Sequence, residues 1–255
     1  MMSFIEYAPY YNLIYRDKDY EGETQFIHEL FQTYSPAIHS IMDLGCGTGN
    51  HAFLLAEKGY ELHGVDLSHN MIQQTADHLS KLPITLKSRL EFSQGDIRDV
   101  RINRQFDAVV SLFHVLSYQT ANDDIKAVFS TVKTHLKPNG LFIFDCWYGP
   151  AVLTDRPAVR IKRLEDENII ITRIAEPKLY PNDNLVDINY QFFIKNKNTG
   201  SVEEFQENHL MRYFFKPELD LLFTEFQFRP IGFYEWMTNR KPGFDSWGVY
   251  FILKG

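Results

Sequence analysis

A glycine-rich run, Asp43-Leu44-Gly45-Cys46-Gly47-Thr48-Gly49, stands directly between an apolar segment and a helical pattern. Glycine lets a backbone approach a ligand closely, and the first N–H groups of a helix are free to bind one. The run therefore predicts a site for a nucleotide-like cofactor. Its spacing is GxGxG, whereas the dinucleotide fingerprint wants a small residue where this chain has Asn50. The spacing weakens a nicotinamide-dinucleotide interpretation without excluding it.

Two acidic residues follow at the ends of later apolar runs. Asp66 closes the second run, 17 residues beyond Gly49, where a carboxylate can accept both ribose hydroxyls of an adenosine ligand. Asp96 lies in the turn Gly95-Asp96-Ile97 after the third run, where it can accept the adenine amino group while Ile97 packs on the ring. The alternative is an α/β protein whose glycine turn has no ligand. That alternative does not explain why the glycine run, Asp66 and the Gly95-Asp96-Ile97 turn occur together at these spacings.

The elements that must position these residues lie between residues 41 and 145. Short apolar runs alternate there with helical patterns, which is typical of a parallel sheet covered by helices. Strands are expected at 40–44, 60–65, 90–94, 106–112 and 141–144. Helices are expected over 50–58, stopped by Gly59, and after the caps Ser68 and Asn122, with a turn at 137–140 leading into the fifth strand.

The pattern of apolar and charged residues changes after Pro150. Residues 159–164 and 169–174 alternate charged and apolar side chains, which indicates antiparallel strands with one wet face. Turn signals at 181–184 and 196–200 separate two more strands. We therefore expect residues 151–212 to be an inserted antiparallel sheet, serving as substrate pocket or dimer contact, with residues 1–150 and 213–255 forming the core. A helix over 217–227 and strands over 228–236 and 247–253 complete that core.

The DLGCGTG loop, Asp66 and the GDI turn together resemble the class I S-adenosylmethionine (SAM)-dependent methyltransferases over residues 41–145. The resemblance implies a Rossmann-like seven-stranded α/β core, SAM as cofactor and S-adenosyl-L-homocysteine as product. It places Gly45 and Gly47 along the methionine half of SAM, with Asp43 beneath it and Asp66 at the ribose. The remaining expected contacts are Leu67 and Met71 beside the adenine, Asp96 and Ile97 at its edge and face, and Leu112 below the pocket.

Within that class the chain resembles the bacterial enzymes that N-methylate TDP-linked deoxyamino sugars. Tyr11-Asn12-Leu13-Ile14-Tyr15 and Lys18-Asp19-Tyr20 are similar to that group's YDxxY...KDY opening, whose tyrosines cover the cofactor. The resemblance therefore places Tyr11 and Tyr20 at the SAM carboxylate or pocket rim; the alternative is that they pack an amphipathic helix onto the core. Glu207 and His209 match the group's ExHxxxxF pattern, and we interpret them as a structural pair on one strand face.

The loop after the fourth strand supplies the catalytic candidates. The sugar N-methyltransferases have a substrate-pocket histidine at the position of Tyr118, and His114 stands four residues earlier; either side chain can face the acceptor or simply pack against the next helix. Methyl transfer is an in-line displacement at a sulfonium, so alignment supplies most of the acceleration. A neutral amine needs no dedicated base, whereas an alcohol needs one, and His114 is then the first candidate.

Aromatic and basic side chains near the later strands are weaker candidates. Trp147 and Tyr148 end the fifth strand at the edge where ligands bind in open α/β sheets. They can stack on a base or sugar ring, or form a hydrophobic hinge. Arg229, Arg240 and Lys241 can meet a diphosphate, but dispersed basic residues are usually solvated surface.

Composition limits the classes of partner. A net charge of -7 without a basic run argues against nucleic acid. Two cysteines and nine histidines show no normal metal-ligand spacing. No leader pattern or membrane-length apolar run is visible, so we expect a cytoplasmic protein with no membrane partner and, as one option, a homodimer.

The expected activity is SAM-dependent methylation of a small polar acceptor, preferably the amino group of a nucleotide-linked amino sugar. The alternatives are O-methylation of a sugar or other small metabolite and a non-catalytic SAM-binding module.

Overall fold

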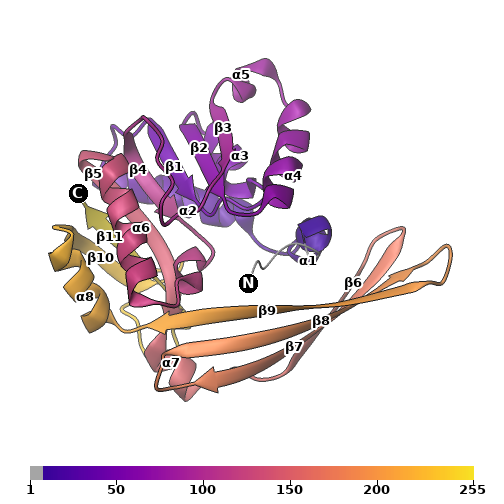
Figure 1. Ribbon diagram of the computed structural model, residues 1–255. Helices are drawn as coiled ribbons and strands as arrows, with labels where there is room; N and C mark the ends of the chain where they lie inside the picture. Colours follow the sequence, from indigo (N-terminus) through magenta and orange to yellow (C-terminus); the bar gives the residue numbers. More distant parts are fainter. Residues whose placement is uncertain (1–7) are drawn as a thin grey trace.

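The computed structural model describes residues 8–255, and its centre is a seven-stranded sheet with the order β3-β2-β1-β4-β5-β11-β10 (Figure 1). The first five strands are parallel, and the last two are antiparallel to their neighbours. This arrangement confirms the predicted fold class. The strands are β1 (Ser40–Leu44), β2 (Glu61–Asp66), β3 (Leu90–Gln94), β4 (Phe106–Ser111), β5 (Leu136–Tyr148), β10 (Arg229–Glu235) and β11 (Gly248–Lys254).

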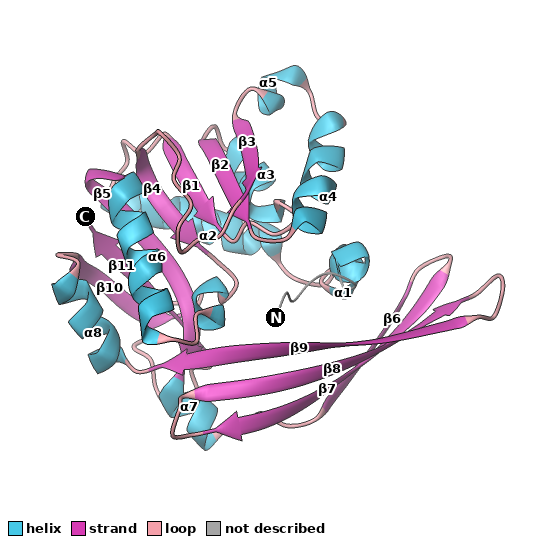
Figure 2. Ribbon diagram, viewed as in Figure 1, coloured by secondary structure: helices cyan, strands magenta, loops and turns pink. Residues whose placement is uncertain are grey.

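Helices cover both faces of the sheet (Figure 2). One apolar cluster joins α6 and α8 to the sheet, and a second joins α2 and α3 to its other face. None of the helices within residues 8–255 is long and apolar enough to cross a membrane. The helices are η1 (Ala8–Tyr10), α1 (Tyr11–Ile14), α2 (Tyr20–Tyr34), α3 (Asn50–Glu57), α4 (His69–Ser80), α5 (Ile84–Lys87), η2 (Val115–Tyr118), α6 (Asn122–His135), α7 (Gly149–Thr154) and α8 (Lys216–Glu225).

Four antiparallel strands, one short and three long, follow α7 and form an arm that reaches away from the core (Figure 1). The arm joins the central sheet where β9 runs parallel to the end of β5, at Trp147 and Tyr148. The short helix α1 packs on the arm through Ile14. The N-terminal segment and the arm therefore both lie at the carboxyl edge of the sheet, where the order reverses between β1 and β4. The arm strands are β6 (Arg160–Glu165), β7 (Ile169–Tyr180), β8 (Leu185–Asn196) and β9 (Val202–Phe214).

Local signals for helix ends are confirmed at two places and wrong at a third. Ser68 caps α4 through a hydrogen bond from the Met71 N–H to its hydroxyl (3.3 Å), and Gly59 ends α3 with a φ of 101°. Asn122 is not a cap, because Ala121 holds that position. The Asn122 side chain instead accepts a hydrogen bond from Arg212 of β9 (2.8 Å), so a long-range partner replaces the local role.

The expected turn at residues 137–140 is also wrong, because β5 already begins at Leu136. Asn139 does take a left-handed φ of 63°, within an irregular stretch of pairing between β4 and β5. Its N–H donates to the carbonyl of Gly255 (3.0 Å). Contacts with Gly255 therefore satisfy backbone groups of Asn139 and Gly140 that the local sequence would leave in a turn.

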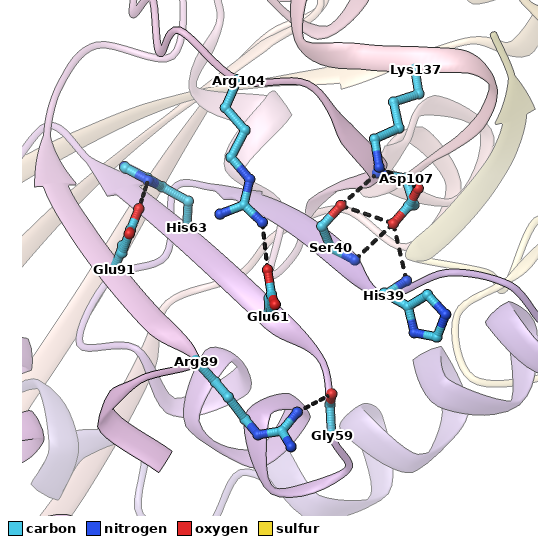
Figure 3. Close-up of polar contacts among 10 residues, drawn as sticks. All are labelled: His39, Ser40, Gly59, Glu61, His63, Arg89, Glu91, Arg104, Asp107 and Lys137. Carbon is cyan, nitrogen blue, oxygen red and sulfur yellow. Dashed lines mark hydrogen bonds and ion pairs between the residues drawn. The ribbon is translucent and has the colours of Figure 1, made fainter. Parts of the chain in front are cut away.

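The amino edge of the sheet is tied together by polar contacts centred on Asp107 (Figure 3). Its Oδ2 accepts hydrogen bonds from the N–H groups of His39 (3.1 Å) and Ser40 (2.9 Å), and Lys137 Nζ lies 2.7 Å from Oδ1. Burial alone would raise the pKa of Asp107, but Lys137 and the Ser40 and His39 donors lower it to about 2. These contacts align the strand starts, and the glycine loop emerges from the opposite edge.

Candidate functional site

The glycine loop follows β1 and takes left-handed backbone angles at three glycines. The φ angles are 85° at Gly45, 56° at Gly47 and 81° at Gly49. A Cβ at Gly45 would lie 2.5 Å from the Val115 side chain, so the loop packs directly against η2. A Cβ at Gly47 would meet no atom of residues 8–255 within 4 Å. The backbone at Gly47 therefore borders open space that a ligand can enter.

Asp66 at the end of β2 holds this loop. Its Oδ2 accepts a hydrogen bond from the Gly47 N–H (2.8 Å), and its Oδ1 accepts one from the Ser68 N–H (2.8 Å). Burial raises the pKa of Asp66, and the two N–H donors oppose that rise. An ionised carboxylate offers about four lone-pair positions, so both oxygens retain capacity for ribose hydroxyls.

Asp43 adds a second buried carboxyl beneath the loop. Burial and the nearby charge of Asp66 raise the pKa of Asp43 to about 7. Burial, Asp43 and Asp66 also raise the pKa of the Cys46 thiol well above its ordinary value. Two carboxylates in one poorly solvated place favour a positively charged ligand, because a cation stabilises their ionised forms. SAM, with its sulfonium and ammonium groups, fits that requirement.

The expected adenine side is built from β2, α4 and the turn after β3. Met71, Ile97 and Leu112 are buried, whereas Leu67 is 48% exposed. Asp96 is held by Arg98, whose Nε lies 3.0 Å from each carboxylate oxygen and whose Nη1 lies 2.8 Å from Asp124. Arg98 lowers the pKa of Asp96. The sequence analysis did not foresee this arginine, and the adenine contacts remain predictions.

The N-terminal segment lies over the glycine loop. Asn12 accepts hydrogen bonds from the Thr48 hydroxyl (2.9 Å) and the Asn50 amide (3.3 Å). Tyr11, the residue before Asn12, packs its ring 4.8 Å from Tyr15. The contacts of Asn12 hold Tyr11 close to the loop in the chain, and the expected place of Tyr11 at the SAM carboxylate or pocket rim stays a prediction.

Tyr20 reaches the same region from α2, with its ring 5.0 Å from that of His51 in the first turn of α3. Glu23, one turn further along α2, is a hub that the sequence analysis missed. Its Oε2 lies 2.7 Å from His51 Nε2, and its Oε1 accepts a hydrogen bond from Trp236 Nε1 (3.3 Å) and pairs with Lys18. Burial opposes ionisation, but His51 and Lys18 lower the pKa of Glu23 to about 2. Glu23 thus ties the segment covering the loop to the core.

His114 occupies a constrained position in the loop after β4. Phe113 and His114 both take left-handed angles, with φ of 66° and 61°, which non-glycine residues rarely adopt. The carboxylate of Asp145 lies 3.1 Å and 3.2 Å from the His114 N–H, and its Oδ2 lies 2.6 Å from His114 Nδ1. The Asp145 side chain is 1% exposed and that of His114 is 23% exposed. A buried carboxylate therefore holds the backbone of His114 and lies beside its partly exposed imidazole, although Nδ1 makes no hydrogen bond among the described residues.

Tyr118 contacts the arm. Its hydroxyl lies 2.8 Å from His209 Nδ1, and His209 Nε2 lies 3.2 Å from Glu207. Burial raises the pKa of Tyr118 well above its ordinary value, so the hydroxyl is neutral. The expected Glu207 and His209 pair is present, and it extends to Tyr118.

Trp147 and Tyr148 lie on opposite faces of β5, as alternating strand residues must. The Trp147 ring is 6.3 Å from that of His114 and 5.6 Å from that of Trp247. The Tyr148 ring packs 5.7 Å from Phe233. The structure therefore places Trp147 beside His114 and Trp247 and directs Tyr148 toward the core.

The basic residues considered for a diphosphate sit elsewhere. Arg240 pairs with Glu235 and, at 3.0 Å, with Asp245, in keeping with a solvated surface. Arg229 is exposed on β10, and Lys241 follows Arg240. Within residues 8–255 no group of three or more His, Cys, Asp or Glu side chains is arranged to hold a metal ion.

Comparisons with known proteins agree with this geometry. A family model described as "Methyltransferase domain" matches residues 41–140. The dTDP-3-amino-3,4,6-trideoxy-alpha-D-glucopyranose N,N-dimethyltransferase of Streptomyces venezuelae is 27% identical over 222 residues, covering 86% of this chain and 89% of that protein. The dTDP-3-amino-3,6-dideoxy-alpha-D-glucopyranose N,N-dimethyltransferase of Streptomyces fradiae is 24% identical, covering 86% and 82%.

The crystal structure of Streptomyces venezuelae DesVI superposes with a TM-score of 0.80 at 25% identity, covering 98% of each chain. The likeness thus includes the arm as well as the core. With its glycine loop, strand order and matched domain, the chain is a class I SAM-dependent methyltransferase that resembles the dTDP-amino-sugar N,N-dimethyltransferases.

Proposed function

We propose that this enzyme transfers the methyl group of SAM to the amino group of a nucleotide-linked amino sugar. The observation that carries the proposal is the extent of the similarity. Two relatives that act on dTDP-amino sugars match 86% of the chain, far beyond the domain at residues 41–140. A shared cofactor domain alone would not extend the match to the segments that surround an acceptor.

The residues around the glycine loop fit SAM, whose sulfonium supplies an electrophilic methyl group. In our proposal Gly45 and Gly47 line its methionine half above Asp43, and Asp66 binds the ribose hydroxyls. The remaining contacts are assigned to Leu67, Met71, Asp96, Ile97 and Leu112 around the adenine, and to Tyr11 and Tyr20 at the rim.

The acceptor side is assigned to the loop after β4, the end of β5 and the arm. His114, Tyr118 and Trp147 come from these elements, and Tyr118 meets His209 of the arm at 2.8 Å. An amine attacks through its lone pair, so the protein has to align it with the methyl group, and the proton that the amine loses can pass to water. We propose residues 151–212 as the unit that shapes the acceptor pocket.

O-methylation of a sugar or other small metabolite is a second candidate. The buried Asp145 beside His114 favours it, because a carboxylate-imidazole pair is the usual device for deprotonating a hydroxyl. Heteronuclear NMR of the product distinguishes the two activities, since a methyl carbon bonded only to oxygen would eliminate the N-methylation proposal.

The first test is thermal unfolding with SAM, S-adenosylhomocysteine or NAD, each with TDP-, UDP- and GDP-linked amino sugars. Stabilisation by SAM together with one sugar nucleotide, followed by methyl transfer to that sugar, is the expected result. Stabilisation by SAM with no response to any amino sugar would refute the proposed acceptor class and leave the methyltransferase assignment intact.

We also propose a cytoplasmic homodimer. The exposed apolar side chains Ile161, Val202 and Leu210 on the arm offer a contact surface. Light scattering would detect a monomer if the dimer proposal is wrong, and cell fractionation tests the location.

A further inference from the structure

We propose that Lys162 and Arg173, on the inner face of the arm, form a subsite for the diphosphate of a sugar-nucleotide acceptor. The inner face is the side of the arm on which α1 and η2 pack. This inference rests on the proposed function and deepens it, because it names the two side chains that would recognise the nucleotide part of the acceptor.

Strand register places these two cations directly opposite each other. Lys162 of β6 and Arg173 of β7 are partners in the antiparallel ladder, so their side chains leave the same face of the sheet. Both residues are partly buried. Like charges in directly opposite positions destabilise a sheet. An anion bound between them would offset that repulsion, and a diphosphate accepts several charge-assisted hydrogen bonds at once.

The charge of Arg173 acts on Lys162. Burial lowers the pKa of Lys162 and Arg173 lowers it further, whereas Asp17 opposes the shift. Asp17 lies on the N-terminal segment with its side chain 67% exposed, so solvent screens its charge. A lowered lysine pKa is expected where cations gather without a compensating anion. A bound diphosphate would supply that anion and favour the charged lysine.

The acidic residues of the inner face lie on a different strand. Glu203 and Glu207 belong to β9, which β8 separates from β7. Glu203 accepts a hydrogen bond from the Tyr10 hydroxyl (3.3 Å), and the Glu207 carboxylate lies 3.2 Å from His209 Nε2. Both carboxylates therefore have partners of their own, and the basic side of the inner face is formed by β6 and β7.

Lys162 joins the arm to the segment that lies over the glycine loop. Its Nζ donates a hydrogen bond to the carbonyl of Ile14 (2.6 Å). That bond uses one of the three N–H donors of the ammonium group, so the others can bind an anion. Nζ also lies 6.0 Å from the ring centre of Tyr15, which contacts Phe113 of the loop after β4 at 5.1 Å. Lys162 therefore lies on the side of the arm that faces the loops at the carboxyl edge.

Arg173 connects this place with the proposed acceptor side. Its guanidinium carbon lies 4.9 Å from the centre of the Tyr190 ring, and a guanidinium that lies over a ring can still bind a phosphate through its edge. The Tyr190 ring is 4.9 Å from the His209 ring, and His209 Nδ1 lies 2.8 Å from the Tyr118 hydroxyl. An acceptor whose amino group lies near Tyr118 would extend its diphosphate along the arm toward Arg173.

Calorimetric titration of the S-adenosylhomocysteine-bound enzyme with TDP tests the subsite without any amino sugar. Lys162→Met and Arg173→Met should each raise the Kd of TDP about 10- to 100-fold, because each removes a charge-assisted contact. Arg163→Met is the matched control. Arg163 is the exposed neighbour of Lys162 on β6, and its side chain leaves the opposite face. Its loss should change the Kd by less than about twofold.

The variants Lys162→Arg and Arg173→Lys separate loss of charge from loss of folding, because each should bind TDP more tightly than the corresponding methionine variant. Raising the ionic strength should weaken TDP binding to the unmodified protein and affect the methionine variants less. Equal affinity for TDP in the unmodified protein, Lys162→Met and Arg173→Met would overturn the inference, and so would absence of TDP binding to the unmodified protein.

Failure of the proposed function is separate from failure of this inference. TDP binding that depends on both cations, with no methyl transfer to any amino-sugar nucleotide, would keep the subsite and refute the proposed acceptor class. Conversely, methylation of an amino-sugar nucleotide with kcat and KM unaffected by Lys162→Met and Arg173→Met would keep the function and remove the subsite.

Discussion

Binding of SAM should release a proton from Asp43. Burial and the charge of Asp66 raise the pKa of Asp43 from its ordinary 3.8 to about 7 in the free enzyme. The cofactor brings a sulfonium and an ammonium to the loop above it, and positive charge favours the ionised carboxylate. The proton should therefore leave as SAM binds, and affinity should rise with pH.

The size of this effect follows from the pKa. Because the pKa of Asp43 is raised in the free protein, its protonated form dominates as pH falls below about 7. Binding of SAM must then expel that proton. If SAM returned the pKa of Asp43 to its ordinary value, affinity would fall about tenfold per pH unit below 7. Because Asp43 is already half protonated at pH 7, the loss between pH 7 and pH 5 would reach about 50-fold, or about 2.3 kcal/mol, as an upper limit.

Isothermal titration calorimetry in buffers of different ionisation enthalpy counts the protons directly. At pH 7 the release should be about half a proton per SAM, rising toward one near pH 6. Asp43→Asn is the matched variant: it should abolish the buffer dependence attributable to this site while leaving Asp66 in place. Binding enthalpies independent of buffer, with a Kd that is flat from pH 5 to pH 8, would refute the reasoning.

Other substitutions test the loop and the opposite sheet edge. Asp66→Asn should weaken SAM binding about 10- to 100-fold, because charge-assisted hydrogen bonds are lost; calorimetry showing an unchanged Kd would remove its ribose assignment. Gly45→Ala should lower the free energy of unfolding by about 3 kcal/mol through its clash with Val115. Gly47→Ala should cost only about 1 kcal/mol yet impair SAM binding; equal effects in denaturant titrations would contradict this contrast. Asp107, with a pKa lowered to about 2 and a side chain 23% exposed, should contribute about 1 kcal/mol above pH 4 after solvent screening. That stability should disappear as pH falls through about 2. The unfolding free energy of Asp107→Asn should therefore depend less on pH below 4 than that of the unmodified protein. The same pH dependence in both proteins would contradict this prediction.

The glycine loop and the position of Asp66 beside it could be predicted from the sequence because their determinants are local. A glycine such as Gly47 reports its own backbone requirement, and Ser68 reports the start of its own helix. Asp66 could be placed because a carboxylate ending the second strand of such a sheet necessarily emerges beside the loop that follows the first. Each inference needed only neighbouring residues and the order of the parallel strands.

The partnerships that sequence reasoning missed join distant segments. Glu23 meets His51 and Trp236, which are separated from it by 28 and 213 residues. Asp145 meets His114 across 31 residues. The N–H of Asn139 donates to the carbonyl of Gly255. No spacing pattern encodes such pairs, because strand register and packing decide them after the fold has formed.

The cofactor side and the acceptor side of the proposed site differ in the same way, because the first depends on local determinants and the second on distant ones. The residues that we propose to bind SAM follow three consecutive strand ends, so one supersecondary unit carries them. The proposed acceptor side instead combines the loop at Tyr118, the strand end at Trp147 and the arm at His209, which meet only through tertiary contacts. Changes in the arm can therefore alter which acceptor is bound while the glycine loop and Asp66 stay as they are. Acceptor preference should then follow the arm residues that face Tyr118, and the requirement for SAM should follow the loop.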